Sequence, residues 1–331
     1  MRAALSFRLL ELPYDPLPYL AQQTAPWVRY NVETDLHVKP ASSAAARSLR
    51  EDILKNPRVE TIISECLNWP GPPIKRHSDS GHTLHKIAFL ADLGLTADEP
   101  PIRLITDRVL SHRSEEGALE SSLQIPRAFG GSGEEALAWI TCDSPTLIYS
   151  LLRFGVTNSF VDTALDHILS LVRDNGLPCR SSVPGFYGPG RKDEHCPYAN
   201  LILLKALAYA PGLKDSWEAE RCIEAQLRHW ENRAGKKIFM FGIGTNFAKV
   251  KYPMVWYDIL HVADVLSRFD AALEDQRFTE MLSLLPAKQT EEGGFTPESI
   301  YVPWKGWSWG QKKTPCPWIT YKVASIFKRL D

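Results

Sequence analysis

The residues that could carry chemistry recur along the chain in front of apolar segments. They are His82, the neighbouring Cys142 and Asp143, Cys196, Asp258 and Cys316. Each lies where a mostly apolar stretch begins, which is the position of a helix N-terminus. Helix N-termini favour anionic groups and thiolates because their backbone N–H groups are unpaired. If the fold gathers these helix starts, their side chains would share one site.

Two glycine-rich basic segments predict a site for an anion. The first, residues 185–192, ends in Arg191 and Lys192, and the second, residues 241–251, ends in Lys251. Together with backbone amides at helix N-termini, these cations would bind a diphosphate, a phosphate or a carboxylate. The alternative interpretation is a pair of solvated basic loops. Neither segment has the frame of a phosphate-binding nucleotide motif, so we expect no nucleotide cofactor.

Aromatic residues are concentrated late in the chain. Five of the ten tryptophans lie between positions 256 and 318. Aromatic walls suit isoprenoid chains and cationic intermediates, and Trp256, Tyr257 and Trp307 are the candidates for substrate contact. Core packing is the alternative for most of these side chains. Trp307 and Trp309 lie among glycine, serine and lysine, which predicts a place at the surface or at the mouth of a cavity.

The elements that must position these residues are helices in a repeat. Glycines at positions 117, 176, 235 and 294 stand 59 residues apart, each after a charged helical stretch. We expect each to close a helix in the left-handed conformation. Segments that are apolar on nearly all sides predict inner helices enclosed by others, whereas amphipathic segments such as 161–172 predict outer helices. The expected inner helices cover residues 82–94, 143–155, 196–208, 256–269 and 315–327.

This pattern resembles the α/α toroid of terpenoid cyclases and protein prenyltransferases. The segment from Lys288 to Phe295 is similar to the glutamine–tryptophan repeat of squalene cyclases, with phenylalanine in the aromatic place. The resemblance implies an all-α fold, a closed ring of inner and outer helices around a central cavity. Residues 1–80 would form a helical extension packed on the ring, and residues 81–331 the toroid. The chain resembles small bacterial proteins of this kind more than any named cyclase.

The resemblance also implies a zinc site at the mouth of the ring. Protein prenyltransferases hold zinc with an aspartate and a cysteine at one inner helix start and a histidine at the next. Here Cys196 matches the cysteine, Glu194 stands in the place of the aspartate, and Asp258 lies nearer than His261 to the place of the histidine. Cys196, Asp258 and His261 would supply three ligands of types that zinc accepts. The alternative is a helix cap beside a buried, hydrogen-bonded His261.

A general acid is the other implied site. Squalene cyclases protonate an alkene with an Asp-x-Asp-Asp motif, which this chain lacks, and oxidosqualene cyclases use an aspartate beside a cysteine. Cys142 and Asp143 resemble that pair in reversed order. A carboxyl group among apolar walls has a raised pKa and can donate a proton. Asp143 before Ser-Pro is also typical of a helix N-cap. His82, three residues before His85, is a further candidate for proton transfer or metal binding.

Composition excludes several classes of protein. The 38 basic and 39 acidic residues give a net charge of −1 with no extended basic tract, so we expect no nucleic-acid partner. No apolar run is long enough for a transmembrane helix, and the first residues lack the apolar core of a signal peptide, which predicts a cytoplasmic protein. The six cysteines form no CxxC pair and are expected to be free thiols. The nucleophile motif of Ser/His/Asp hydrolases and the aspartate-rich motif of ionising terpene synthases are also missing.

The sequence therefore predicts an enzyme that acts on an apolar or isoprenoid-like substrate in the cavity of the ring. The chemistry would be zinc-assisted transfer or acid-initiated cyclisation. The alternative is a non-catalytic toroid that holds a lipid or a peptide. A third reading, an open helical array that recognises proteins, would need an exposed apolar concave face.

Overall fold

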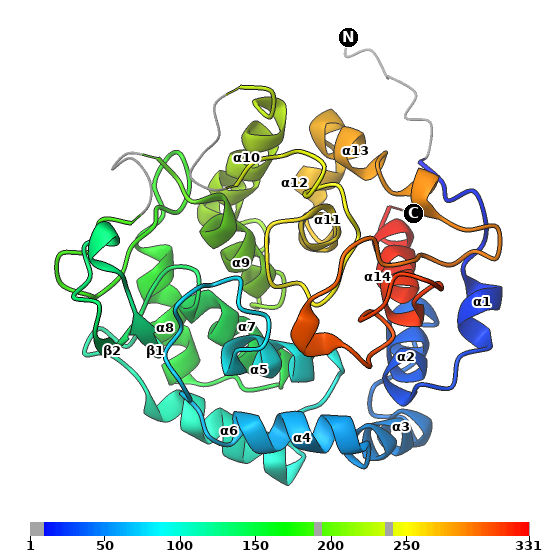
Figure 1. Cartoon of the computed structure of the whole chain (residues 1–331), viewed down its shortest axis with the longest axis horizontal. Coiled ribbons are helices and arrows are strands. Elements are labelled where there is room, and N and C mark those ends of the chain that lie inside the picture. The colour runs from blue at the N-terminus through cyan, green and yellow to red at the C-terminus, as the bar shows by residue number, and fades with distance from the viewer. Residues whose placement is uncertain (1–9, 189–193, 236–240, 331) are drawn as a thin grey trace.

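The computed structural model describes residues 10–188, 194–235 and 241–330, and helices are the main secondary structure of this part of the chain. The helices lie in two layers around a common centre (Figure 1). The inner layer contains α5 (Thr83–Asp92), α7 (Ser144–Arg153), α9 (Pro197–Leu207), α11 (Ile259–Leu266) and α14 (Pro317–Lys328). The structure thus confirms a helix in each of the five segments expected to form the inner layer. None of the described helices combines the length and the apolar character needed to cross a bilayer.

The outer helices are amphipathic and begin at recognisable caps. Ser43 and Ser216 each accept a backbone N–H from three residues further on, and Asn158 accepts two. The helices around the inner layer are α3 (Ala44–Leu54), α4 (Pro57–Cys66), α6 (Pro100–Ser111), α8 (Ser159–Leu169), α10 (Trp217–Glu231), α12 (Asp270–Leu273) and α13 (Gln276–Leu282). Short 3₁₀ turns occupy Arg127–Phe129, Pro286–Lys288 and Val302–Trp304.

The first two helices of the chain pack against its last helix, α14. Helix α14 contacts α1 (Leu17–Ala21) and α2 (Pro26–Asn31), and α2 continues into a π-helix at Val32–Leu36. Successive inner helices contact one another in the order α5, α7, α9, α11 and α14, and α14 contacts α2. The Asn31 side chain, at the end of α2, donates to the carbonyl oxygen of Leu93, just after α5, at 3.2 Å. Residues before position 80 therefore share one hydrophobic core with the rest of the chain.

The repeated glycines close turns rather than helices, which corrects the expectation. Gly117 (φ 86°) and Gly176 (φ 101°) are left-handed, but the preceding helices α6 and α8 have already ended several residues earlier. Gly293 rather than Gly294 is left-handed in the last copy, and Gly235 is not. The C-caps of α6, α8, α10 and α13 all have negative φ, so the left-handed Gly117, Gly176 and Gly293 belong to the turns that follow.

Two of these turns are joined to the start of the next inner helix by the same pair of hydrogen bonds. In one copy the Cys196 N–H donates to the Leu177 carbonyl at 2.9 Å, and the Leu177 N–H donates to Asn200 Oδ1 at 2.8 Å. In another copy, Cys316, Phe295 and Thr320 repeat both bonds, at 2.8 and 2.9 Å. In these two copies, the repeat thus corresponds to a recurring pair of hydrogen bonds that fixes where the inner helix begins.

The fold is mainly helical, as expected, and also contains two short strands that form an antiparallel sheet. Strand β1 (Ser121–Gln124) pairs with β2 (Glu135–Ala138) in the register Ser121 opposite Ala138. Neither strand has clear period-2 alternation. The pair depends on a connection with left-handed Gly130 and Gly133, which leads the chain back beside β1.

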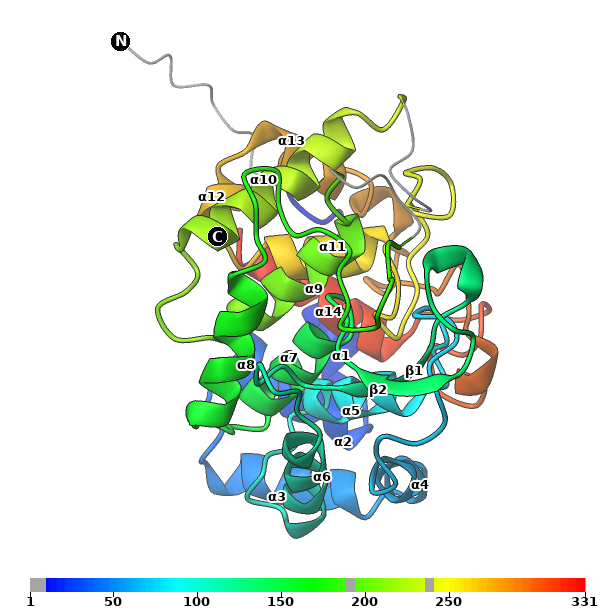
Figure 2. The same cartoon turned by 90° about the vertical axis from the view of Figure 1, so that its left-hand side faces the viewer.

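The small sheet positions a segment of the candidate site. Ile74 exchanges two backbone hydrogen bonds with β1, to Ser122 at 2.8 Å and from Gln124 at 3.0 Å. Figure 2 shows β1, β2 and the long connections gathered on one side of the helical layers. The residues that follow Ile74 are therefore held above the starts of the inner helices.

Candidate active site

A pocket of about 630 Å³ opens beside the first turns of α7 and α9. Most of its wall is apolar or aromatic, formed by Ile74, Leu123, Ile125, Pro126, Phe129, Ile140, Phe186, Tyr198, Phe241 and Trp256. The polar groups are His77, Lys75, Arg76, Ser78, Gln124 and three thiols, Cys142, Cys179 and Cys196. A predominantly apolar wall with a few convergent polar groups is typical of a small-molecule site.

His77 and Asp143 form the central polar pair of this site. His77 Nδ1 lies 2.9 Å from Asp143 Oδ1, and the Asp143 side chain is buried, with the residue 1% exposed. The His85 ring, on α5, contacts the His77 carbonyl oxygen through Nε2 at 2.7 Å and so fixes the His77 backbone. The second carboxylate oxygen of Asp143 has no hydrogen-bond partner among the described residues.

Asp143 occupies the N-cap position of α7 but does not cap the helix. His82, Cys196 and Asp258 each accept a backbone N–H of their own helix, whereas the Asp143 side chain accepts none. The N-cap interpretation of Asp143 is therefore correct for its position and wrong for its side chain. The carboxylate turns instead to His77.

This pairing changes the proton affinity of His77. Enclosure in the protein would lower the pKa of His77, but the negative charge of Asp143 and its hydrogen bond raise that pKa above the usual value. The Cys196 side chain adds to this increase. The His77 ring can therefore hold a proton beside the pocket at a pH where a free histidine would lose it.

The three thiols of the pocket have different environments. Burial and the neighbouring Asp143 charge raise the pKa of Cys142 well above its usual value. Cys196 differs because the neighbouring Cys179 side chain and the Ala199 backbone nitrogen, which lies 3.5 Å from the Cys196 sulfur, lower its pKa. The Cys196 side chain and burial raise the pKa of Cys179. Cys196 is therefore the thiol of this pocket that is best placed to be a thiolate.

The ligand set expected for zinc does not come together. Among the described residues, the group of His, Cys and carboxylate side chains that meets within 4.8 Å is His77, Cys142 and Asp143. Asp258 instead caps α11 by accepting the His261 N–H at 3.1 Å, and His261 Nδ1 lies 2.9 Å from the Trp256 carbonyl. A cluster of three possible metal ligands exists, but it contains none of Cys196, Asp258 and His261.

Asp258 gives a pH-dependent prediction for stability. Burial raises the pKa of Asp258 to about 7, although Lys251, whose Nζ lies 3.7 Å from Oδ2, opposes this shift. The folded-state pKa exceeds the unfolded-state value, so the stability linked to this group is present at acid pH and is lost as the pH rises through about 7. The variant Asp258→Asn keeps a capping side chain without the charge.

We expect Asp258→Asn to raise the free energy of unfolding by about 2–4 kcal/mol at pH 8 and by about 1 kcal/mol or less at pH 4.5. Urea unfolding of both proteins at the two pH values measures this difference. An equal effect at both values would contradict the raised pKa of Asp258.

Other predicted site residues take structural places. Both ring nitrogens of His82 are used, one accepting the Leu84 N–H and the other 2.7 Å from the Pro72 carbonyl. The Tyr257 hydroxyl donates to Gln226 Oε1 at 2.8 Å in the core. Trp256 alone among the aromatic candidates lines the pocket.

Trp307 and Trp309 are not surface residues, which corrects the prediction for their loop. They are 8% and 0% exposed and stack on each other at 4.9 Å. Phe89, Trp27 and Trp304 surround them. The loop folds inward because burial of its large rings outweighs the polarity of the residues between them.

Arg191 and Lys192, predicted to bind an anion, lie outside the described residues.

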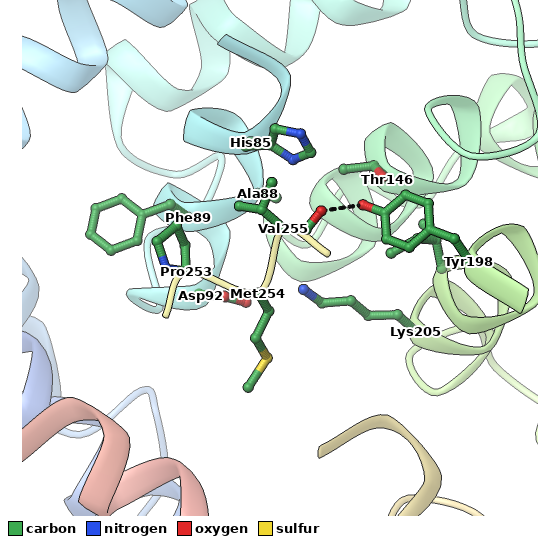
Figure 3. Close-up of a pocket in the computed structure, with 11 residues that line it drawn as sticks. His85, Ala88, Phe89, Asp92, Thr146, Tyr198, Lys205, Pro253, Met254 and Val255 are labelled. Carbon is green, nitrogen blue, oxygen red and sulfur yellow. Dashed lines mark hydrogen bonds between the residues drawn. The ribbon is translucent and has the colours of Figure 1, made fainter. Parts of the chain in front are cut away.

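A second polar cluster fills the centre of the helices below the pocket. Figure 3 shows Asp92 and Lys205 directed toward one another beneath Tyr198, whose hydroxyl donates to the Val255 carbonyl at 2.9 Å. Tyr149 and Tyr252 donate to the two Asp92 oxygens. Burial would raise the pKa of Asp92, but Lys205 and Lys322, with these hydroxyls, lower it to about 2. Tyr198 belongs to the walls of both spaces and separates them.

His77 is the candidate site residue that the sequence did not reveal. It lies before position 80, outside the repeat, and no spacing connects it with Asp143, 66 residues later. A Lys-Arg-His run between prolines and serines carries no pattern of its own. Only the pairing of Ile74 with β1 brings His77 over the start of α7.

No protein-family model matches the sequence, and curated proteins offer no match either. Solved structures with a similar shape include a protein from Actinoplanes (15% identity, TM-score 0.42, 92% of this chain and 90% of that one). They also include the type II terpene cyclase MstE from Scytonema (14%, 0.42, 92% and 88%) and a GH76 alpha-mannanase from Bacteroides thetaiotaomicron (12%, 0.46, 92% and 84%). A terpene cyclase is thus among the structural neighbours, as the repeat pattern implied.

Proposed function

We propose that the chain is an enzyme that binds an apolar, isoprenoid-like substrate in the pocket and starts its cyclisation by proton transfer from the His77–Asp143 pair. We further propose that the two helical layers form a closed α/α toroid with this pocket at its mouth. One observation carries the proposal: a buried carboxylate at a helix start gives up the capping bond and holds a histidine at the pocket instead.

The walls of the pocket support an isoprenoid-like substrate. Phe129, Phe186, Phe241, Trp256 and Tyr198 present aromatic surface, and no carboxylate lines the wall described above. Aromatic faces stabilise a positive charge that moves along a hydrocarbon chain during cyclisation. Lys75 and Arg76 at the same pocket provide cations for an anionic or polar head group.

The pair can deliver and recover one proton. With His77 protonated, Nδ1–H donates to Asp143, and the proton on the other ring nitrogen passes to a substrate carbon. The carboxylate stabilises the charged ring before the transfer. After ring closure the cationic product returns a proton to the neutral imidazole, so the substrate and product have the same formula.

Isotope incorporation tests this proposal. A substrate-bound structure of MstE contains geranylgeranyl dihydroxybenzoate, which makes this compound a suitable first probe. In D₂O we expect a cyclic isomer that carries one deuterium per molecule, detected by mass spectrometry. A product without deuterium would contradict proton-initiated cyclisation, as would no product from this compound and from linear polyprenes of other lengths.

Zinc-assisted transfer is the second candidate, favoured by the cluster of His77, Cys142 and Asp143. The three donors are of types that zinc accepts, but His77 Nδ1 and Asp143 Oδ1 are engaged with each other at 2.9 Å. This hydrogen bond fits proton transfer better than metal binding. Elemental analysis of purified protein decides between the two candidate functions. One zinc per chain, lost in Cys142→Ser, would favour zinc-assisted transfer over proton transfer from the His77–Asp143 pair.

A toroid that only binds a lipid or a peptide is the remaining alternative. It requires the pocket but not the His77–Asp143 pair, so it predicts that ligand binding is unchanged when the pair is broken.

We also propose a cytoplasmic location, supported by free thiols at all six cysteines.

A further inference from the structure

The pocket has an exposed end and a buried end. Lys75, Arg76 and Pro126 line it and are exposed to solvent, whereas Tyr198 lines it from α9 and is 2% exposed. A linear ligand enters between the exposed residues and runs towards the buried part of the wall. Of the wall residues that the structure describes, Tyr198 is the one that also lines the small space around Asp92 and Lys205, here called the lower space.

The lower space continues the pocket along the same face of α9. Cys196 and Tyr198 line the pocket, and Tyr198, Ile202 and Lys205 line the lower space (Figure 3). Residues spaced by four and three positions lie on one face of a helix, so these side chains follow one another down α9. The lower space measures about 10 Å³, which is room for about one water molecule. The chain of a ligand therefore stops at the Tyr198 ring.

The Tyr198 ring is held in place from two sides. Its hydroxyl donates to the Val255 carbonyl at 2.9 Å, which links α9 to the segment before α11. Its ring lies 5.2 Å from that of Trp256, centre to centre, and Trp256 belongs to the same pocket wall. A ring that swung aside would lose the hydrogen bond in a buried place, which costs more than losing it in water. The end of the pocket is therefore rigid.

The groups beneath the ring oppose an apolar chain as well. Lys205 is 6% exposed, and its ammonium lies 4.4 Å from the centre of the Tyr149 ring. Asp92 is 4% exposed and accepts from the Tyr149 and Tyr252 hydroxyls. A hydrocarbon end packed against this charged pair would remove polar surroundings from it and return no hydrogen bond. The ring and the charges beneath it therefore limit the pocket at the same place.

We propose that the Tyr198 ring closes the pocket and determines the longest apolar chain that binds there. The inference rests on the part of the proposed function that places an apolar chain in the pocket, and it does not require cyclisation. Each CH₂ group that the pocket buries strengthens binding about fourfold. Once the chain end meets the ring, further carbon atoms stay in water and the affinity stops rising.

Calorimetric titration with straight-chain fatty acids from octanoate to stearate, below the concentrations at which they form micelles, tests the inference. In the wild type we expect the affinity to rise with chain length and to level off at one length. Tyr198→Ala should move this limit to a chain that is longer by a few CH₂ groups. The first acid beyond the wild-type limit should bind Tyr198→Ala at least about ten times more tightly than the wild type. The shift should stay small because Lys205 and Asp92 lie beneath the ring.

Three further variants isolate the effect of the ring. Tyr198→Phe keeps the ring without its hydroxyl and should keep the wild-type limit. Tyr321→Ala is the matched control, because Tyr321 is a buried inner-helix tyrosine with a bonded hydroxyl and lies outside the pocket wall. It should also keep the wild-type limit. Circular dichroism checks that the variants fold, and Tyr198→Leu, which removes less volume, provides the same comparison if Tyr198→Ala does not.

The outcomes separate this inference from the proposed function. An unchanged limit in the folded Tyr198 variants with smaller side chains would overturn the inference, and so would a steady rise up to stearate in the wild type. Neither result touches the cyclisation test. A shifted limit without a deuterated cyclic product would support the inference and contradict the proposed reaction. If none of the acids bound, the apolar ligand itself would be wrong and both would fall.

Discussion

Asp143→Asn is expected to lower cyclisation about 10²–10⁴-fold while substrate binding changes little. Asparagine matches the shape of the carboxylate but carries no charge, so it no longer stabilises a protonated His77 across the 2.9 Å contact. The pKa of His77 should fall, and the ring would be neutral at the pH of the assay. The apolar walls do not change, so the probe should still bind.

The loss is measured by product formation from geranylgeranyl dihydroxybenzoate, and binding by the quenching of Trp256 fluorescence at the pocket wall. Asp275→Asn is the matched control, because Asp275 is an N-cap aspartate of the outer helix α13 and binds Arg277 far from the pocket. Turnover by Asp143→Asn at the wild-type rate would exclude the pair as the proton source and favour the binding-only alternative.

Asp92→Ala is expected to cost about 3–5 kcal/mol of stability, the largest effect of any single change that we predict. Its carboxylate accepts from the Tyr149 and Tyr252 hydroxyls and compensates the charges of Lys205 and Lys322, all in the buried space between the inner helices. Alanine would leave these cations and hydroxyls buried without a partner. Urea unfolding monitored by circular dichroism measures the loss.

The cost comes from unpaired charge and not from the missing carboxylate as such. We therefore expect the double change Asp92→Leu with Lys205→Met to destabilise less than Asp92→Ala alone, since both buried charges leave together. Asp107→Ala, on the exposed face of α6, should stay within about 0.5 kcal/mol of the wild type. If the double variant proved less stable than Asp92→Ala, the central cluster would be a favourable network in its own right.

The inner helices could be read from the sequence because their signal is local. A segment such as Pro197–Leu207 is buried at every residue, and a run that is apolar on all sides fits no other place in a helical fold. The starts of the helices were equally clear, since the residues that could cap them precede each run. The strands β1 and β2 were missed because four-residue strands with polar residues carry almost no periodicity.

The direction of each capping side chain could not be read in the same way. Asp143 and Asp258 occupy equivalent helix starts, yet one turns to His77 and the other caps α11. The zinc ligands predicted from helix starts failed to meet for this reason: capping bonds hold Asp258 and Cys196 to their own helices. Likewise, the polar residues around Trp307 predicted exposure, but the neighbouring rings buried it.

The sequence by itself determined the helical repeat, the position of every inner-helix start and the set of thiols and carboxylates found there. These features follow from apolar periodicity and backbone hydrogen bonding within a few residues. Tertiary structure alone decided which of those groups lie together. His77 reaches Asp143 only because Ile74 joins β1. Proton affinity depends on such neighbours in space, which no spacing along the chain records.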